Sequence, residues 1–326
     1  MGKRNTRIVI LGGGTGLSTL LRGLKKFPID ITAIVTVADD GGSSGRLRDD
    51  YEIPPPGDVR NVIAALSEVE PLVEEMFQYR FLASEDLRGH SLGNLMLTAL
   101  TEITGDFSHA IREMSRVLNV HGKVLPAANQ RITLFAELID GTIVKGESKI
   151  PTFNTGIKRI FLSPEDVKPL PESVSAIKKA DIIIIGPGSL YTSILPNLLV
   201  DDIQEAIISA KGKKVYICNL MTQAGETQNF AASDHVKALN DHLGQPFIET
   251  ILINKEEVPA SVRAAYKEEE AEPVFFDVGA LEKMGIQVVK KEIATTHDGV
   301  VRHEASKVAE WLVEYAHSFN SDIKMI

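Results

Sequence analysis

The chain has 326 residues, of which 44% are hydrophobic and 24% charged, and a formal net charge of −9 at pH 7. This composition is typical of a soluble globular protein with one large α/β domain or two smaller ones, and the charge argues against non-specific nucleic-acid binding. The one cysteine, Cys218, excludes a disulfide framework. No signal-like leader and no apolar run of the ~18 residues that a membrane helix needs is found, so we expect a cytoplasmic protein without membrane insertion.

The first predicted strand leads directly into glycines. Residues 7–11 form an apolar strand, residues 12–16 read Gly-Gly-Gly-Thr-Gly, and an apolar-periodic helix follows. Such glycines let the backbone approach a phosphate, which the amides of the next helix then face. The dinucleotide fingerprint G-x-G-x-x-G is incomplete, because Leu17 stands at its third glycine, and the lysine of a P-loop is missing. The alternative is an ordinary tight turn.

The second predicted strand, residues 31–37, is followed by Asp39, Asp40 and a glycine- and serine-rich run to residue 45. We expect this run to be a ligand-binding loop, because it is too long for a simple reversal. Acidic residues at this point could bind a ribose hydroxyl or a divalent cation such as Mg²⁺. Since neighbouring residues on a strand point to opposite sides, we expect only one aspartate to face the ligand. In the alternative interpretation, one of the two aspartates caps the next turn and the other is solvated.

Helices are predicted after this run. A Pro-Pro-Pro-Gly turn at 54–57 precedes a helix that we expect Asp58 to cap. Further helices are expected at 71–81, 92–103 and 106–118 from their apolar periodicity. Asn61 follows Asp58 by one turn, and Asn94 is expected on the polar side of its helix. His90 is interpreted either as a base or ligand, or as a structural hydrogen-bonding residue.

The pattern changes after residue 122. Strands at 133–138 and 142–148 flank Asp140-Gly141, which is a strong hairpin signal, and residues 157–162 form a third strand. We therefore divide the chain into residues 1–122, the N-terminal half of a Rossmann-like core; residues 123–165, a small β insertion; and residues 166–326, the C-terminal half.

The parallel pattern then resumes. Residues 181–185 are continuously apolar, as in a strand covered on both faces, and they end in a second glycine loop at 186–189. A strand at 213–220, a helix at 233–243 and a strand at 250–254 follow, and the last helix has a core stripe. In open α/β sheets ligands gather at the carboxyl ends of strands, where Gly12, Asp39, Gly186 and Asn219 all fall. The fold class is thus α/β, Rossmann-like and doubly wound, with a mostly parallel sheet and a small β-rich insertion.

Six segments, 12–16, 38–48, 55–61, 89–94, 186–193 and 219–223, resemble in order those of the CofD-like superfamily. More closely they are similar to the YvcK-type gluconeogenesis factors (UPF0052), which are related to 2-phospho-L-lactate transferase. The resemblance implies a nucleotide-type ligand, with UDP-sugars such as UDP-N-acetylglucosamine expected in the gluconeogenesis-factor branch. That branch is tied to growth on gluconeogenic carbon, cell shape and cell-wall precursor supply. The transferase branch builds a deazaflavin cofactor with a divalent metal.

Three functions follow as hypotheses. The first is a UDP-sugar-sensing regulator without turnover, which would act on a protein partner in amino-sugar or cell-wall synthesis and form a homo-oligomer. The second is a Mg²⁺-dependent transferase that uses Asp39 or Asp40, and the third is an NAD(P)-binding protein. Catalytic residues stay unassigned, and Arg302 is expected to bind the UDP-sugar because the resemblance implies it. The expected ligand-binding residues are Gly12, Gly13, Gly14, Thr15, Gly16, Asp39, Asp40, Ser43, Ser44, Arg46, Asn61, Asn94, Gly186, Gly188, Ser189, Asn219, Thr222 and Arg302.

Overall fold

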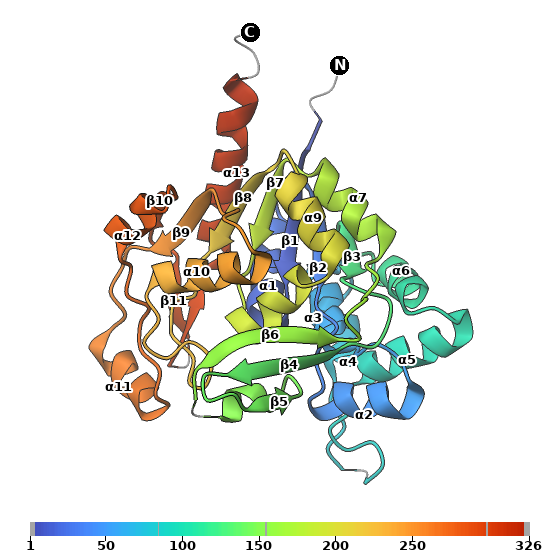
Figure 1. Cartoon of the computed structure of the whole chain (residues 1–326). Coiled ribbons are helices and arrows are strands. Elements are labelled where there is room, and N and C mark those ends of the chain that lie inside the picture. The colour runs from blue at the N-terminus through green and yellow to red at the C-terminus, as the bar shows by residue number, and fades with distance from the viewer. Residues whose placement is uncertain (1–3, 84, 154, 298, 323–326) are drawn as a thin grey trace.

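The computed structural model describes residues 4–83, 85–153, 155–297 and 299–322. Its centre is a seven-stranded parallel sheet with the order β10-β9-β8-β7-β1-β2-β3, flanked by helices (Figure 1). The strands of this sheet are β1 (Thr6–Gly12), β2 (Ile29–Val35), β3 (Lys123–Pro126), β7 (Ile182–Ile185), β8 (Lys213–Ile217), β9 (Thr250–Asn254) and β10 (Gln287–Lys291). The predicted Rossmann-like fold class is confirmed.

Helices connect these strands and cover both faces of the sheet. On the two faces, α1 packs against α3 and α13, and α7 packs against α9. The α-helices are α1 (Gly14–Leu24), α2 (Gly42–Tyr51), α3 (Gly57–Leu66), α4 (Pro71–Gln78), α5 (Leu92–Thr104), α6 (Phe107–Val117), α7 (Pro171–Lys179), α8 (Leu195–Leu198), α9 (Asp201–Ser209), α10 (Ala232–Leu243), α11 (Ala260–Glu268), α12 (Val278–Lys283) and α13 (Ala305–Asp322). Two short turns of other helix types are η1 (Ile150–Thr152) and η2 (Leu190–Ile194).

Burial explains the central strands. All four isoleucines of β7 are buried, as expected for a strand covered by helices on both faces. β7 pairs with β1, which pairs with β2 on its other side. No described helix combines the length and the apolar character needed to span a membrane.

The predicted hairpin is confirmed. β4 (Thr133–Leu138) pairs antiparallel with β5 (Ile143–Lys145) and with β6 (Ile157–Ser163) in a separate three-stranded sheet. Residues 123–126, which the sequence assigns to the insertion, instead form the edge strand β3 beside β2. The small-sheet region reaches the segments that follow the parallel strands, because the Ser148 N–H, in the loop after β5, donates to Oδ1 of Asp40, which follows β2, at 2.9 Å. Figure 1 shows it lying across that end of the molecule.

Two local predictions were wrong. Residues 42–45 are not a loop, because α2 begins at Gly42 with Ser43, Ser44 and Leu47 buried. Packing on α5 outweighs the low helix propensity of glycine and serine. Asp58 is not the cap of α3 either: Pro56 occupies that position, and Asp58 lies in the first turn.

Other elements show which local signals are reliable. Asp106 does cap α6, since its carboxylate accepts a hydrogen bond from the His109 N–H at 2.6 Å. Trp311 and Tyr315 of α13 stack with ring centroids 5.0 Å apart and belong to the core side. Four of the described strands carried no sequence prediction: β3 and β10 at the two edges of the parallel sheet, and β11 (Ala294–His297) with β12 (Val300–His303), which form a two-stranded sheet.

Candidate functional site

The first glycine loop (residues 12–16) and the second glycine loop (residues 186–189) meet at the centre of the sheet. They follow β1 and β7, which are neighbouring strands. From β1 the sheet continues to β2 on one side, and from β7 it continues to β8 on the other. In open α/β sheets ligands bind in the crevice where the strand order reverses in this way.

Packing accounts for part of the glycine content of the first loop. A Cβ on Gly16 would lie 3.3 Å from the carbonyl oxygen of Pro187, so the two loops are in close contact. Gly14 has a φ of +64°, which glycine adopts without a steric penalty. The N–H of Gly14 donates to the carboxyl group of Asp58, so one amide of this loop already contacts an oxygen-bearing acid.

Asparagine side chains hold the two loops together. Asn219 Nδ2 donates to the carbonyl oxygen of Gly188 at 2.9 Å, and the buried Asn197 Nδ2 donates to the carbonyl oxygen of Gly12 at 3.2 Å. Asn219 thus lies at the predicted site, whereas Asn197 has no sequence signal. Thr222 is buried, and its hydroxyl accepts a hydrogen bond from the Glu272 N–H at 2.9 Å.

Glu226 is a site residue that sequence reasoning missed. It is 3% exposed, and its carboxylate accepts hydrogen bonds from the Tyr191 N–H at 3.1 Å, the Thr192 hydroxyl at 2.9 Å and Gln223 Nε2 at 2.8 Å. Gln223 Oε1 in turn accepts from the Ser189 hydroxyl at 2.7 Å. Burial raises the pKa of Glu226 to about 7 against the opposing effect of these donors. The second glycine loop is therefore positioned through a buried acid.

A cavity of about 310 Å³ opens between the loops and β12. Arg302 is exposed at its wall, and the Tyr266 hydroxyl accepts a hydrogen bond from the Val301 N–H at 3.0 Å. Burial lowers the pKa of His303 to about 4, so the neutral ring donates to the carbonyl oxygen of Cys218 at 3.1 Å. The cavity is lined by Thr15, Gly16, Thr19, Pro187, Gly188, Asn219, Leu220, Met221, Tyr266, Val300, Val301, Arg302 and His303.

Carboxylates crowd the opposite side of the first glycine loop. Asp40 Oδ1 accepts a hydrogen bond from the Ser148 N–H at 2.9 Å, so Asp40 contacts the small-sheet side. Asp39 instead lies near Asp58. Burial, followed by the charge of Asp39, raises the pKa of Asp58 to about 6. Burial, followed by the charges of Asp39 and Asp58, raises the pKa of Glu147 to about 8. Within the described residues, no three His, Cys, Asp or Glu side chains are arranged to hold a metal ion.

A polar network lies where α2 packs on α5. Asn94 is 2% exposed rather than on a solvated face, and its Nδ2 donates to the Ser43 hydroxyl at 3.0 Å. His90 Nδ1 lies 3.0 Å from the same hydroxyl oxygen, and burial followed by the charge of Arg46 lowers the pKa of His90. The structure therefore brings together a hydroxyl and a neutral imidazole that are far apart in sequence.

The remaining predicted residues lie beside this network. Ser44 is buried. Arg46 is exposed and donates to the Arg88 carbonyl oxygen at 2.5 Å. Asn61 Oδ1 accepts a hydrogen bond from Arg60 Nη2 at 2.6 Å. None of these three residues lines the 310 Å³ cavity, so the cavity does not bring all of the predicted residues together.

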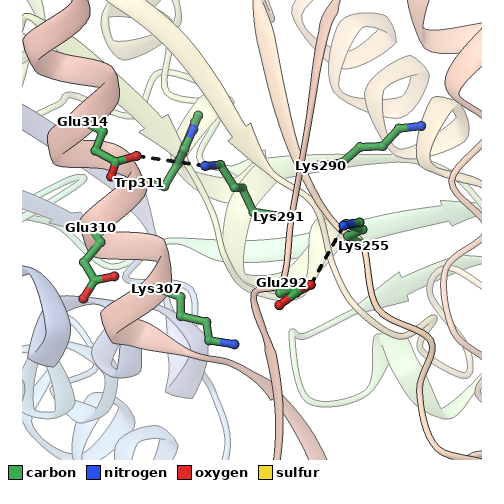
Figure 2. Close-up of a pocket in the computed structure, with 8 residues that line it drawn as sticks. All are labelled: Lys255, Lys290, Lys291, Glu292, Lys307, Glu310, Trp311 and Glu314. Carbon is green, nitrogen blue, oxygen red and sulfur yellow. Dashed lines mark ion pairs between the residues drawn. The ribbon is translucent and has the colours of Figure 1, made fainter.

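A separate cavity of about 300 Å³ lies between α13 and the ends of β9 and β10 (Figure 2). Four lysines, three glutamates and Trp311 line it. Lys255 pairs with Glu292 at 3.9 Å, and Lys291 pairs with Glu314 at 4.0 Å. Its charges largely balance and none of the predicted site residues reaches it, so we do not assign the function to this cavity.

Comparison with known proteins decides the family. The family model described as 2-phospho-L-lactate transferase CofD matches residues 8–294. The chain belongs to the CofD family. It is 62% identical over 308 residues to the gluconeogenesis factor of Bacillus subtilis (strain 168), covering 94% of this chain and 97% of that protein. The gluconeogenesis factor of Halalkalibacterium halodurans is 57% identical over 324 residues, covering 99% and 100%.

A solved structure agrees with this CofD-family assignment. The crystal structure of a UPF0052 family member from Bacillus halodurans matches with a TM-score of 0.93 and 57% identity, covering 96% of this chain and 100% of that one. The resemblance predicted from the sequence segments is thus confirmed. The CofD model ends before β12 and Arg302, whereas the match to the H. halodurans factor covers almost the whole chain.

Proposed function

We propose that this CofD-family member is a gluconeogenesis factor that binds a nucleotide sugar of the UDP-N-acetylglucosamine type and acts as a regulator without turnover. The observation that carries the proposal is the 310 Å³ cavity at the strand-order reversal, which both glycine loops and Arg302 line. Loop amides and a helix N-terminus suit a diphosphate, and a guanidinium adds a bidentate donor for it. In this proposal the diphosphate of the ligand binds to this wall of the cavity.

The comparisons support the regulator over the transferase. Relatives of 62% and 57% identity are named gluconeogenesis factors, and Arg302 lies beyond the residues that the transferase model matches. Control of cell shape and cell-wall precursor supply, through a partner in amino-sugar or cell-wall synthesis, forms part of the proposal. Its cytoplasmic location and self-association stay predictions.

Calorimetric titration of the purified protein tests the proposal. We expect UDP-N-acetylglucosamine to bind more tightly than GDP, NAD or NADP, each titrated with and without Mg²⁺. Chromatography of the mixture should show that the nucleotide sugar has not been converted to a product. Arg302→Ala should weaken this binding, whereas Arg263→Ala, which removes an exposed arginine of α11 outside the cavity lining, should leave it unchanged. Equal affinity for all four nucleotides would contradict the proposal, as would the same loss in both variants.

The carboxylates favour a second candidate, a Mg²⁺-dependent transferase of the 2-phospho-L-lactate transferase type. Burial, followed by the charges of the nearby Asp39 and Asp58, raises the pKa of Glu147 to about 8, and carboxylate oxygens are ligands that Mg²⁺ prefers. A cation would relieve the repulsion among them. Binding of GDP only with Mg²⁺, together with donor exchange that Asp39→Asn abolishes, would favour this candidate.

A further inference from the structure

Two arginines from different elements, Arg46 and Arg80, bond to the segment 87–91, and a third, Arg60 of α3, lies within electrostatic range of Arg80. We call Arg46, Arg60 and Arg80 the arginine cluster. Arg46 of α2 donates to the carbonyl oxygen of Arg88, and Arg80, which follows α4, donates to the carbonyl oxygen of Gly89. The charge of Arg80 acts on Arg60, and the charges of Arg46 and Arg80 both act on His90. Arg46 and Arg80 are therefore held at the same turn, and Arg60 lies within electrostatic range of Arg80.

No member of the arginine cluster forms an ion pair within the described residues. Other arginines among the described residues do form ion pairs: Arg159 pairs with Glu137 at 2.6 Å, and Arg4 pairs with Asp181 at 2.8 Å. In the cluster the acceptors are neutral: two backbone carbonyls and the side-chain amide oxygen of Asn61. A carbonyl only partly satisfies a guanidinium, which has five donors in a fork that fits a carboxylate or phosphate.

Arg60 provides the second observation. It is 6% exposed, and its Nε is buried without a hydrogen-bond partner in the described structure. Burial followed by the charge of Arg80 lowers the pKa of Arg60 to about 10, although Asp58 and Asp39 oppose this. A buried cation with an unsatisfied donor is costly unless something pairs with it.

Neutral hydrogen-bonding groups complete the surroundings. The Ser43 hydroxyl accepts from Asn94 Nδ2 and lies 3.0 Å from His90 Nδ1, and Asn94 Oδ1 is buried without a partner. A Cβ on Gly89 would lie 3.2 Å from Arg46 Nη2, so the glycine allows that guanidinium to approach the turn. The neutral network of Ser43, His90 and Asn94 thus lies next to the turn that Arg46 approaches.

We propose that the arginine cluster is a binding site for a phosphate group, distinct from the wall of the 310 Å³ cavity. None of the three arginines lines that cavity. The phosphate belongs either to the nucleotide sugar itself or to a second phosphorylated molecule bound beside it. The proposal does not depend on the proposed function, because phosphate binding is measurable without a nucleotide.

This site is tested by calorimetric titration of the whole protein with inorganic phosphate in chloride buffer. We expect saturable binding that Arg46→Ala and Arg80→Ala each weaken by about tenfold or more. Arg88→Ala is the matched control, because Arg88 is exposed in the same turn, offers only its backbone carbonyl to the cluster and carries the same charge. Arg88→Ala should change the affinity less than about twofold.

Two results would overturn the proposal: no saturable binding by the unmodified protein, or an equal loss in the Arg88→Ala control, which would indicate a diffuse charge effect. Arg46→Ala and Arg80→Ala should both keep the melting temperature of the parent protein. The buried position is tested with Arg60→Lys, which retains the positive charge. A competition arm identifies the source of the phosphate. Displacement of phosphate by UDP-N-acetylglucosamine assigns the site to the diphosphate of that ligand, and simultaneous binding assigns it to a second molecule.

Discussion

Replacing Glu226 by glutamine is expected to stabilise the protein at pH 8 and to leave its stability at pH 5 almost unchanged. Glutamine has the shape of a protonated glutamic acid, with one carbonyl oxygen to accept and one group to donate. The Thr192 hydroxyl and Gln223 Nε2 both bond to Oε1 of Glu226, so a glutamine oxygen placed there retains both. At Oε2, however, an amide nitrogen replaces the oxygen that accepts the Tyr191 N–H, which costs about 1 kcal/mol at every pH. The pH-dependent effect of the substitution is the removal of the negative charge.

The sign follows from the pKa in the two states. Burial raises the pKa of Glu226 from its ordinary 4.5 to about 7 in the folded protein. Between these values the folded state keeps a proton that the unfolded state has released, so the free energy of unfolding falls as pH rises. At about 1.4 kcal/mol per pKa unit, the loss amounts to about 3 kcal/mol once pH exceeds the folded value. The glutamine variant lacks this loss.

Urea unfolding of both proteins at pH 5, 6, 7 and 8 measures the difference. We expect free energies of unfolding within about 1 kcal/mol at pH 5. At pH 8 the removed charge outweighs the lost Tyr191 hydrogen bond and gives Glu226→Gln an advantage of about 2 kcal/mol. Glu205→Gln, an exposed change on α9, controls for the lost charge and should show no such divergence. A variant that is less stable at pH 8, with an unchanged pH dependence, would refute the reasoning and show that the hydrogen bonds to an ionised carboxylate dominate.

Three further predictions concern the glycine loops. Asn197→Ala should lower the free energy of unfolding by about 2 kcal/mol, measured by urea titration, because it removes the side-chain donor that joins the carbonyl oxygens of Gly12 and Ser193; an unchanged midpoint would contradict this. Gly13→Ala should weaken nucleotide-sugar binding by about tenfold or more, since its Cβ would lie 2.6 Å from Asp58 Oδ2, whereas Gly279→Ala, with open space around it, should have no effect on calorimetric affinity. Arg302→Ala should weaken the same binding by about tenfold while the melting temperature stays constant, and a large drop in that temperature would indicate a structural role.

Local patterns predicted the fold well where burial or turn chemistry is expressed in consecutive residues. The four isoleucines of β7 and the Asp140-Gly141 turn are such cases. β10 was missed because it is an edge strand whose last two residues are exposed lysines. The start of α2 was missed because glycine and serine have low helix propensity, and contacts with α5 that no local window contains stabilise it.

The site divides in the same way. The glycine loops were predictable because a strand followed by glycines is a contiguous signal, and their meeting follows from parallel topology. Asn197 and Glu226 were not, because each acts on a loop through a contact set by tertiary packing, Glu226 by way of Gln223. The interior position of Asn94 was also missed, since it depends on α2 covering that face of α5.

The central strand pairing has a consequence for how the chain is synthesised. β1 pairs with β2 soon after it in sequence, but its other neighbour, β7, begins only at Ile182. During translation one edge of β1 stays open until more than half of the protein has left the ribosome, and contacts of such long sequence separation form slowly. The crevice is therefore among the last features to be assembled, and a nascent chain that stops before β7 exposes an unpaired apolar edge, which is a target for chaperones or aggregation.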